Sequence, residues 1–550
     1  MYFRRSPCRY LLYALFDILL LKGENMRKIC RLLFSRITLS LVFIVAEVVL
    51  MGLLYSYAYS YYAVIGFLAR VISFAVLISL INEDTNPEFK LTWLATVLLL
   101  PLFGAVLYII FSKRRTTKRE TAFLMKIGGS FEASARENGE LTASAQMLGE
   151  LSRSSFTLGG IAHSLMADDP LARLYREEDI KYFPSGEELY RDMLSSLELA
   201  EKYIFLEYFV IEEGKMWQGI YEILKRKAKE GLDVRVLYDD MGTICTLPYG
   251  FEKRLRADGI RAERFSKVTP TLTSSHNNRD HRKITVVDGV IAYTGGVNIA
   301  DEYINEVQKY GHWKDGGVRV SGAAAMGFAR LFLSLYDMTA RTLSDYGAFF
   351  DASSELAPFY LKDKKEKNGF VLPIGTGPMP FYKNQVGKSA LMNIIGSAKR
   401  YVYLTTPYLI IDYDLTEALR AAAKRGVDVR VITPGVADKK FIKIMTKSTY
   451  PTLCKDGVRI FEYSPGFIHE KLAVADDAVA MIGTVNLDYR SLVHHFEDAL
   501  IIFLSDEIKS ITDGVMKTLS SSCEICLADA KLNLFEKIVQ GLSRIFFPLL

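Results

Sequence analysis

The chain contains the same nine-residue pattern twice. Residues 281–289 read HRKITVVDG and residues 469–477 read HEKLAVADD, each with His, then Lys two places later, then Asp five places after the Lys. Lys and Asp each make up about 6% of average proteins, so a given histidine meets this pattern by chance about four times in a thousand. Matching residues also follow the two copies at equal spacing: Gly295, Gly296 and Asn298 after the first, and Gly483, Thr484 and Asn486 after the second. The repeat therefore predicts two copies of one folding unit.

Strand and helix patterns around the two motifs repeat as well. YIFLEYFVI (203–211) and YVYLTTPYLI (401–410) each predict a buried strand, followed by a helix pattern that ends in a Lys/Arg-rich turn and Gly. Val-rich strands follow at 231–239 (GLDVRVLYD) and 426–434 (GVDVRVITP). A strand, a helix and a strand within about 35 residues form a βαβ unit, which is typical of α/β domains with a largely parallel sheet.

At 550 residues the chain is too long for one ordinary core, so two or three domains are expected. The fold class predicted is α/β, with two duplicated domains that meet face to face as a pseudo-symmetric pair behind an α-helical membrane region. The expected parts are a membrane-associated helical region at 1–112, a basic and polar linker with helical portions at 113–170, a first domain at 171–350, a second domain at 370–530 and a C-terminal amphipathic helix at 531–550.

Three apolar segments in the N-terminal region predict membrane association. Segments 37–59, 61–81 and 91–111 are each long enough to cross a hydrocarbon core of about 30 Å, although Glu47 and Arg70 interrupt the first two. Basic residues flank the region on both sides, which three full crossings do not allow. One segment is therefore expected to be re-entrant or interfacial.

Charge and cysteine content exclude other classes of protein. A net charge of +5 with pI about 8.6 is too mild to indicate nucleic-acid binding, and we expect no nucleic-acid partner. The six cysteines are scattered, so they indicate neither a disulfide framework nor a zinc site. No metal and no cofactor are expected.

The motif residues suit displacement at a phosphodiester. In each copy two short apolar runs flank an acidic turn, which predicts a hairpin, and His and Lys two places apart then project from one face of a strand. Two halves together supply two imidazoles, one to attack phosphorus and one to protonate the leaving oxygen, and the usual pKa of about 6.5 suits both tasks. We expect His281 and His469 in these catalytic roles. Phosphate binding is assigned to Lys283, Lys471, Asn298 and Asn486.

Acidic residues near each motif are given two different roles. A working imidazole needs an acceptor on its other nitrogen, and Asp315 and Glu497, downstream of the two motifs, are the candidates. Asp288 and Asp476 complete the catalytic motifs, but they fall in the inferred turns, so we expect them to act structurally. The remaining histidines lack a repeated context and are expected to be incidental, with His312 and His495 near the site: His163, His276, His312, His494 and His495.

These residues resemble the phospholipase D superfamily, whose signature is this motif in two copies, and within it the bacterial cardiolipin synthases. The resemblance extends over KLTWLATVLLLPLFGAVLYIIFSKRR, GGVNIADEY, GTVNLDYRS and the closing FFPLL. The chain departs from the family pattern at His495, where Asn is expected.

The resemblance implies transfer of a phosphatidyl group between two phosphatidylglycerol molecules, giving cardiolipin and glycerol without a cofactor. His281 would form a phosphatidyl-histidine while His469 protonates the departing glycerol, although the two roles could be exchanged. Alternatives are a membrane-tethered phosphodiesterase that uses water, a synthase that takes CDP-diacylglycerol as donor, and an inactive lipid-binding scaffold. The implied location is the bacterial inner membrane, with several crossings and cytoplasmic active domains. No oligomeric state is indicated.

Overall fold

The computed structural model describes residues 59–83, 86–111, 117–268, 278–362 and 367–527, with a few isolated positions elsewhere. The chain divides into two compact units, one of residues 1–85 and 93–109 and the other of residues 86–92 and 110–550. The apolar segment expected at 37–59 and the amphipathic helix expected at 531–550 lie almost wholly outside the described residues.

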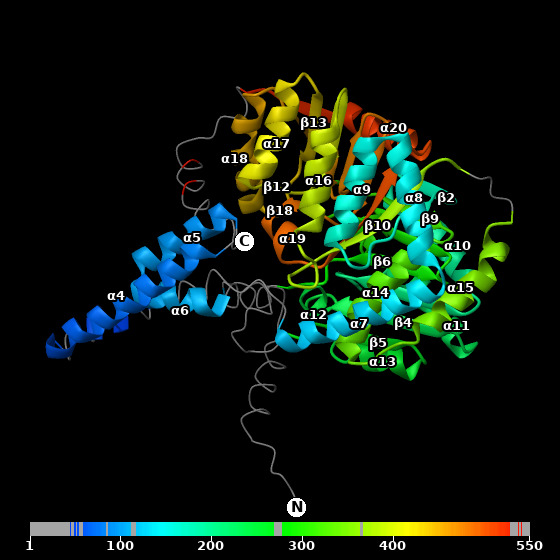
Figure 1. Cartoon of the computed structure of the whole chain (residues 1–550), viewed down its shortest axis with the longest axis horizontal. Helices are drawn as coiled ribbons and strands as arrows, with labels where there is room; N and C mark the ends of the chain where they lie inside the picture. Colours follow the sequence, from blue (N-terminus) through cyan, green and yellow to red (C-terminus); the bar gives the residue numbers. More distant parts are fainter. Residues whose placement is uncertain are drawn as a thin grey trace, which may run out of the picture. The chain divides into compact units, whose positions relative to one another are not determined.

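Two β-sheets with the same strand order form the larger unit (Figure 1). The first sheet runs β2-β9-β7-β6-β3-β4-β5, and the second contains the equivalent series β10-β19-β17-β16-β11-β13-β14 with β1 and β20 added at its edges. The strands of the first sheet are β2 (Asp179–Phe183), β3 (Tyr203–Tyr208), β4 (Asp233–Asp239), β5 (Arg261–Phe265), β6 (Lys283–Val287), β7 (Ile291–Gly295) and β9 (Gly317–Ser321). Those of the second are β1 (Tyr175–Arg176), β10 (Phe370–Thr376), β11 (Tyr401–Thr405), β13 (Asp428–Pro434), β14 (Arg459–Tyr463), β16 (Leu472–Ala475), β17 (Val479–Gly483), β19 (Glu497–Phe503) and β20 (Ser522–Ile525). The duplication predicted from the repeated motif is confirmed.

The sheets are mixed, and the expectation of a largely parallel sheet is wrong. Only β3–β4 and β4–β5 pair in parallel in the first sheet, and β11–β13 and β13–β14 in the second. The motif-bearing hairpins β6–β7 and β16–β17 and the strands beyond them are antiparallel. A hairpin has to reverse the chain direction, so each βαβ unit continues into an antiparallel half-sheet.

Helices cover the sheets, and one helix is buried among them. α14 (Ala325–Ala340) is buried along residues 325–337 and belongs to a core cluster that takes apolar side chains from both halves, including Phe205, Leu372 and Val402. The other helices of the two halves are α10 (Gly186–Glu198), α11 (Lys215–Lys229), α12 (Asp240–Thr243), α13 (Phe251–Ala257), α15 (Tyr346–Tyr360), α16 (Val386–Ser397), α17 (Tyr413–Lys424), α18 (Lys440–Cys454), α19 (Tyr489–Val493) and α20 (Glu507–Ser520). One continuous core therefore joins the two halves.

Residues 113–170 were expected to be a linker with helical portions. They contain three helices, which pack into this core: α7 (Lys118–Glu137), α8 (Glu140–Ser154) and α9 (Phe156–Asp168). Thr117 and Glu120 form a capping box at the start of α7. One face of each helix is apolar and buried, as at Ile127, Leu151 and Leu165. α7 packs on α14 of the first half and α9 packs on α16 of the second, so the segment contacts both halves (Figure 1).

The apolar segment expected at 91–111 is two helices rather than one. α5 (Pro87–Leu99) ends before Pro101, where α6 (Pro101–Phe111) begins, because proline lacks the N–H that a continuous helix needs. The Ser73 hydroxyl of α4 (Tyr59–Asn82) donates to the Pro101 carbonyl at 2.6 Å. No helix among the described residues is both long enough and apolar enough to span a bilayer.

Candidate functional site

Both motifs lie on hairpins, and the motif acids occupy the turns. Asp288 and Asp476 adopt left-handed conformations, with φ of 52° and 57°, which Asp tolerates better than most residues. Asp288 accepts hydrogen bonds of 2.8 Å from three consecutive amides, those of Glu201, Lys202 and Tyr203. Asp476 accepts from the amides of residues 399–401 in the same way. A strand rises about 3.4 Å per residue, which separates each acid from its motif Lys by about 17 Å, so these acids hold the turn instead of contacting the histidines.

His281 is held by the second half of the chain. Its amide donates to the Phe496 carbonyl at 2.8 Å, and its Nδ1 lies 2.8 Å from Glu497 Oε2. The other carboxylate oxygen of Glu497 accepts from the Ser491 hydroxyl at 2.6 Å. The imidazole is thus oriented by a carboxylate that begins β19.

His469 is held by the first half in the equivalent way. Its amide donates to the Lys314 carbonyl at 2.8 Å, and its Nδ1 lies 2.8 Å from Asp315 Oδ2. The Gly316 amide donates to Asp315 Oδ1 at 2.8 Å. The two halves also share a small two-stranded sheet here, because β15 (Gly466–Ile468) pairs with β8 (His312–Lys314). Each histidine therefore receives its acceptor from the opposite half, which the position of the acids downstream of their own motifs does not reveal.

Four cationic or imidazole groups gather where the halves meet. Lys283 Nζ donates to the His281 carbonyl at 2.6 Å, and Lys471 Nζ lies 2.8 and 2.9 Å from the two ring nitrogens of His469. Both histidines are only 7% exposed. Burial, followed by the charges of Lys283, Lys471 and His469, lowers the pKa of His281 well below its usual value. The charged motif residues of the second half thus lower the pKa of the histidine in the first half.

The pKa values of both motif imidazoles lie below the usual value of about 6.5 on which the sequence argument depends. Burial and Lys471 lower the pKa of His469 to about 4, so both rings are neutral near pH 7. Burial also lowers the pKa of Lys283 to about 8 and that of Lys471 to about 7. Burial is the largest cause of both lysine shifts, the carboxylates of Asp315 and Glu497 oppose it, and an anion bound between the two ammonium groups would oppose it further.

The two asparagines differ in their contacts. Asn298 accepts from the Val210 amide at 3.1 Å through Oδ1 and donates to the Tyr303 hydroxyl at 2.7 Å through Nδ2. Asn486 Oδ1 is buried and makes no hydrogen bond within the described part of the chain. Asn298 thus positions Tyr303, whose ring centroid lies 5.5 Å from that of His469, while phosphate binding by either amide remains a prediction.

Aromatic rings that the sequence did not single out surround the histidines. Phe209 lies 5.0 Å from His281 between ring centroids, and Trp313 lies 5.6 Å from His469. His495, which the sequence placed near the site, also lies beside a motif histidine, with 5.6 Å between its ring centroid and that of His281. Trp313 and His495 each stand two residues before the acid that orients a histidine. A ring at this spacing in both halves is the sequence signal that could have placed these two residues beside the motif histidines.

The remaining described histidines make other contacts. His312 Nδ1 lies 3.0 Å from the Tyr463 hydroxyl, and the His494 ring faces Phe89 with 6.1 Å between centroids. His163 is exposed on α9, and His276 lies outside the described residues. Of the described histidines outside the motifs, His495 is thus the one placed against a motif imidazole.

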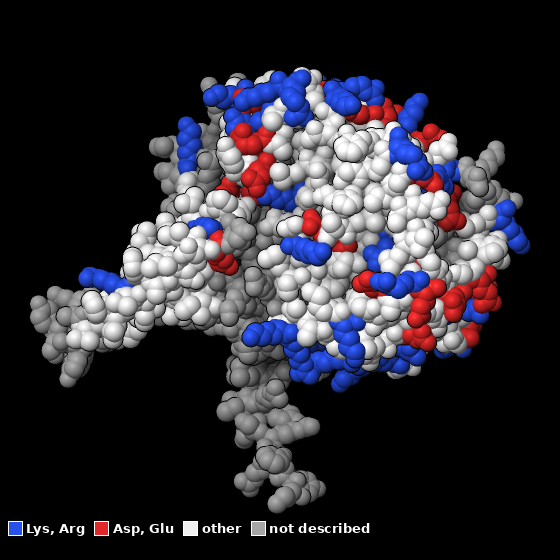
Figure 2. Space-filling view, in the orientation of Figure 1, with Lys and Arg blue, Asp and Glu red and all other residues white. Residues whose placement is uncertain are grey.

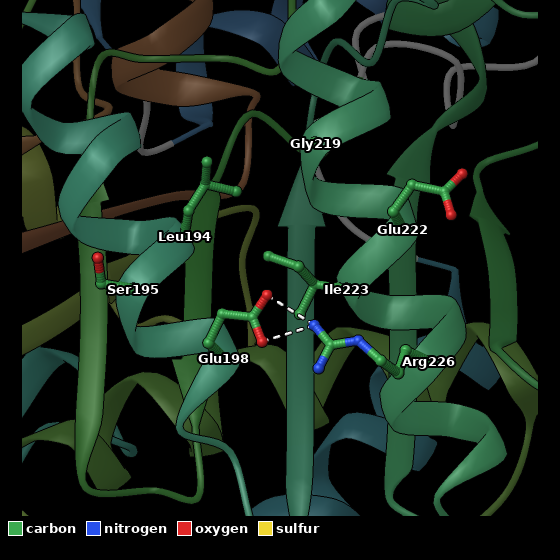
Figure 3. Close-up of a pocket in the computed structure, with 7 residues that line it drawn as sticks. All are labelled: Leu194, Ser195, Glu198, Gly219, Glu222, Ile223 and Arg226. Carbon is green, nitrogen blue, oxygen red and sulfur yellow. Dashed lines mark hydrogen bonds and ion pairs between the residues drawn. The ribbon is translucent and has the colours of Figure 1, made fainter.

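One further groove lacks motif residues. It lies between α10 and α11, where Arg226 and Glu198 form an ion pair across it, and no motif residue lines it (Figure 3). Both basic and acidic side chains are visible on the face shown in Figure 2, in keeping with the mild net charge.

Comparisons with known families and proteins agree with this geometry. The family model described as "Cardiolipin synthase, PLD-like domain" matches residues 193–309 and 391–517, and the model described as "Phospholipase_D-nuclease N-terminal" matches residues 71–113. The two matched stretches of the first model each contain one hairpin motif.

Similar proteins are bacterial. An uncharacterized protein of Streptococcus mutans is 37% identical over 86% of this chain and 98% of its own length. The cardiolipin synthase of Alkalihalophilus pseudofirmus is 31% identical over 88% of this chain and 94% of its length, and that of Staphylococcus aureus is 30% identical over 83% and 90%. The solved phosphatidylserine synthase of Haemophilus influenzae has a TM-score of 0.53 at 14% identity, covering 70% of this chain and 97% of its own, which shows a shared fold.

Proposed function

The chain belongs to the bacterial cardiolipin synthases of the phospholipase D superfamily, and from that membership we propose that it joins two phosphatidylglycerol molecules into cardiolipin and glycerol. It is a phosphatidyltransferase of the kind that makes phospholipids. The observation that carries the proposal is the pair of His–carboxylate contacts across the two halves, His281 with Glu497 and His469 with Asp315. Such a pair supplies an attacking group and a proton donor at one phosphorus.

In the proposed first step, His281 attacks the phosphorus of phosphatidylglycerol. The bond from phosphorus to the glycerol oxygen breaks, and His469 gives that oxygen a proton, leaving a phosphatidyl group on His281. Lys283 and Lys471 neutralise the charge of the phosphate oxygens. The bound anion also raises the pKa values that burial and the two ammonium groups lower in the free site, so His469 can carry the proton it donates.

In the second step the neutral His469 removes a proton from the hydroxyl of another phosphatidylglycerol. That oxygen attacks phosphorus and the bond to His281 breaks, which restores the enzyme. One phosphodiester is broken and one is made, so the exchange needs no nucleotide. The near-equal motifs also allow the two histidines to exchange roles.

Water is the competing acceptor. Transfer to water would give phosphatidic acid, and a synthase has to limit it by keeping the reacting atoms dry. The low exposure of His281 and His469, and the aromatic rings of Phe209, Tyr303 and Trp313 beside them, favour transfer to a lipid hydroxyl.

We place the enzyme at the bacterial inner membrane with its two halves on the cytoplasmic side. In the smaller unit, large apolar side chains are exposed, among them Phe67 at 65%, Phe74 at 65% and Leu99 at 73%. Side chains of this kind are stable in contact with acyl chains. Most atoms of the helices α4–α6 are uncharged in the space-filling view (Figure 2), although Arg70, Glu88 and Lys90 lie in α4 and α5, and such a surface fits this contact.

The test is incubation of the purified full chain, in detergent–lipid micelles, with phosphatidylglycerol alone. Cardiolipin and glycerol in equal amounts would support the proposal. Phosphatidic acid would indicate the phosphodiesterase that uses water. Cardiolipin formed only after CDP-diacylglycerol is added would indicate the other donor, and no product with either donor would indicate the lipid-binding scaffold.

A further inference from the structure

Three ligand atoms of a type suited to a transition metal meet beside His281. His281, His495 and Glu497 each offer one such atom, and these atoms all lie within 4.8 Å of one another. Two imidazoles and one carboxylate form a common ligand set for zinc in proteins. His495 supplies the ligand that completes the set, and it stands where the family resemblance leads one to expect Asn.

The His495 ring has no competing partner in the described part of the chain. Both of its nitrogens are buried and neither makes a hydrogen bond, while Nδ1 stands 3.6 Å from Glu497 Oε1. Leaving a buried polar atom unpaired costs about 1–3 kcal/mol. A ligand that bonds to this ring would remove that cost without breaking an existing contact of the ring.

The spacing needs small shifts to accept an ion. Zinc–nitrogen and zinc–oxygen bonds of about 2.0–2.1 Å at tetrahedral angles put neighbouring ligand atoms about 3.3 Å apart. His281 Nδ1 and Glu497 Oε2 are 2.8 Å apart, so they would have to separate by about 0.5 Å while His495 moves inward. The metal ion would replace the proton that these two groups share.

Ligand chemistry also selects the ion. Imidazole nitrogens suit Zn²⁺, Ni²⁺ and Cu²⁺, whereas Mg²⁺ and Ca²⁺ prefer a shell of oxygen atoms. Lys283 and Lys471 contribute positive charge near His281 and weaken the binding of any cation. The site should accordingly bind Zn²⁺ in the micromolar range, more weakly than a structural zinc site does.

We propose that His281, His495 and Glu497 form an inhibitory binding site for Zn²⁺ and similar transition-metal ions. The bound ion takes the Nδ1 lone pair of His281, and the proton that Nδ1 shared with Glu497 moves to Nε2. Nε2 then has no free lone pair, so His281 can neither attack phosphorus nor accept a proton. Binding itself is independent of the reaction, but the inhibition rests on the proposed function.

Zinc binding to the full chain in lipid-free detergent micelles is the first measurement, by equilibrium dialysis at pH 7.5. The chain should carry a tag without histidine and Ser in place of all six cysteines, because free thiols also bind zinc. One Zn²⁺ per chain is expected. His495→Asn should weaken this binding at least about 100-fold, since loss of an outer-shell partner alone costs 10–100-fold.

Matched controls separate this site from other histidines. His312→Asn changes an exposed ring and His494→Asn changes the neighbouring buried ring, and both variants should bind one Zn²⁺ as tightly as the parent chain. His495→Gln repeats the test with a longer amide. Unchanged zinc affinity in both His495 variants would overturn the proposal.

Turnover then links binding to inhibition. Zn²⁺ should stop turnover at the concentration that fills the site, EDTA should restore it, and Mg²⁺ and Ca²⁺ should have no effect. His495→Asn should keep its turnover at that zinc concentration. Zinc binding that leaves the parent chain active would overturn the inhibitory role. A parent chain that makes no cardiolipin without zinc would instead contradict the proposed function, and the binding result would still stand.

Discussion

Each histidine of the site depends on one carboxylate that the chain supplies from far away. Glu497 and Asp315 are fully buried, and each divides its two oxygens between an imidazole and a second donor, Ser491 or Gly316. Although burial opposes it, His469 lowers the pKa of Asp315 below its usual value. The carboxylate therefore stays charged, which fixes the imidazole tautomer and its orientation.

His281→Ala and His469→Ala should both lose turnover, but to different extents. Loss of the nucleophile removes the covalent route, so we expect a fall of at least about 10⁴-fold for His281→Ala. Loss of the proton donor should cost about 10²–10⁴-fold. Rates of cardiolipin formation measure both, with His312→Ala as an exposed control. If both motif variants kept most of their activity, the mechanism would be discarded, and a reversed order of losses would exchange the two roles.

Glu497→Gln and Asp315→Asn should each lower kcat by about 100-fold while leaving KM nearly unchanged. An amide keeps the shape of the side chain but cannot stabilise the charged imidazole, and partners of this kind are worth about 10–100-fold or more. Steady-state kinetics on mixed micelles separates the two parameters. A change confined to KM would mean that these carboxylates act on binding instead.

Chelators should leave the rate unchanged or raise it. The proposed chemistry uses two imidazoles and two ammonium groups, and the metal site inferred beside His281 is inhibitory. Cardiolipin formation with and without EDTA is the measurement. A rate that EDTA abolishes and that Mg²⁺ restores would show that the site has been misinterpreted.

At the scale of the element, the hairpin is the repeated unit. In both copies His lies just before the first strand and Lys lies at or just before its first residue, and the motif Asp closes the turn against the segment that leads into β3 or β11. Asp288 is fully buried and accepts a fourth hydrogen bond, from Tyr360 at 2.7 Å, whereas Asp476 is partly exposed. The same motif residue therefore carries more stability in the first half.

Asp288→Asn should lower the free energy of unfolding by about 2–3 kcal/mol, and Asp476→Asn by about 1 kcal/mol. Asn tolerates the left-handed turn, but its NH₂ cannot accept the bonds that Asp288 Oδ2 receives from the Glu201 amide and Tyr360. Urea unfolding followed by circular dichroism gives both values. Equal losses, or a larger loss at Asp476, would contradict the difference in burial.

At the scale of the whole molecule, buried charges lie where the halves join. Arg282 is fully buried and donates to the Glu497 carbonyl at 3.3 Å and to the Tyr382 hydroxyl at 2.6 Å, so it ties the first half to the second. Beside it, burial raises the pKa of Asp280 to about 7, and the pKa of Glu207 is also raised. The two carboxyl groups are most stable when they share a proton.

Stability should therefore fall as the pH rises from about 4 to about 7 through the titration of Asp280. Its folded pKa is above its unfolded value, so the stabilising protonated form is present below pH 4 and is lost on passing pH 7. The slope is at most about 1.4 kcal/mol per pH unit for one group. Urea unfolding at several pH values, compared with Asp280→Asn, isolates this effect. The variant should have the flatter curve, and identical slopes would contradict it.

The sequence by itself determined the parts that depend on local pattern. The repeated motif predicted two equivalent halves, because the same sequence pattern of strands and turns favours the same local fold in both places. Alternation along the strand placed His281 with Lys283, and His469 with Lys471, and the acidic turn placed Asp288 and Asp476 away from them.

The tertiary structure decided which residues meet across the chain. It paired Glu497 and Asp315 each with the histidine of the opposite half and placed His495 against His281. It also packed the helical portions of the expected linker at 113–170 against both halves. Contacts of this kind depend on how two complete halves dock. Short-range periodicity in the sequence does not predict which distant residues that docking brings together. Pairing between the halves is set by the burial of their shared core, which exists only once both have folded.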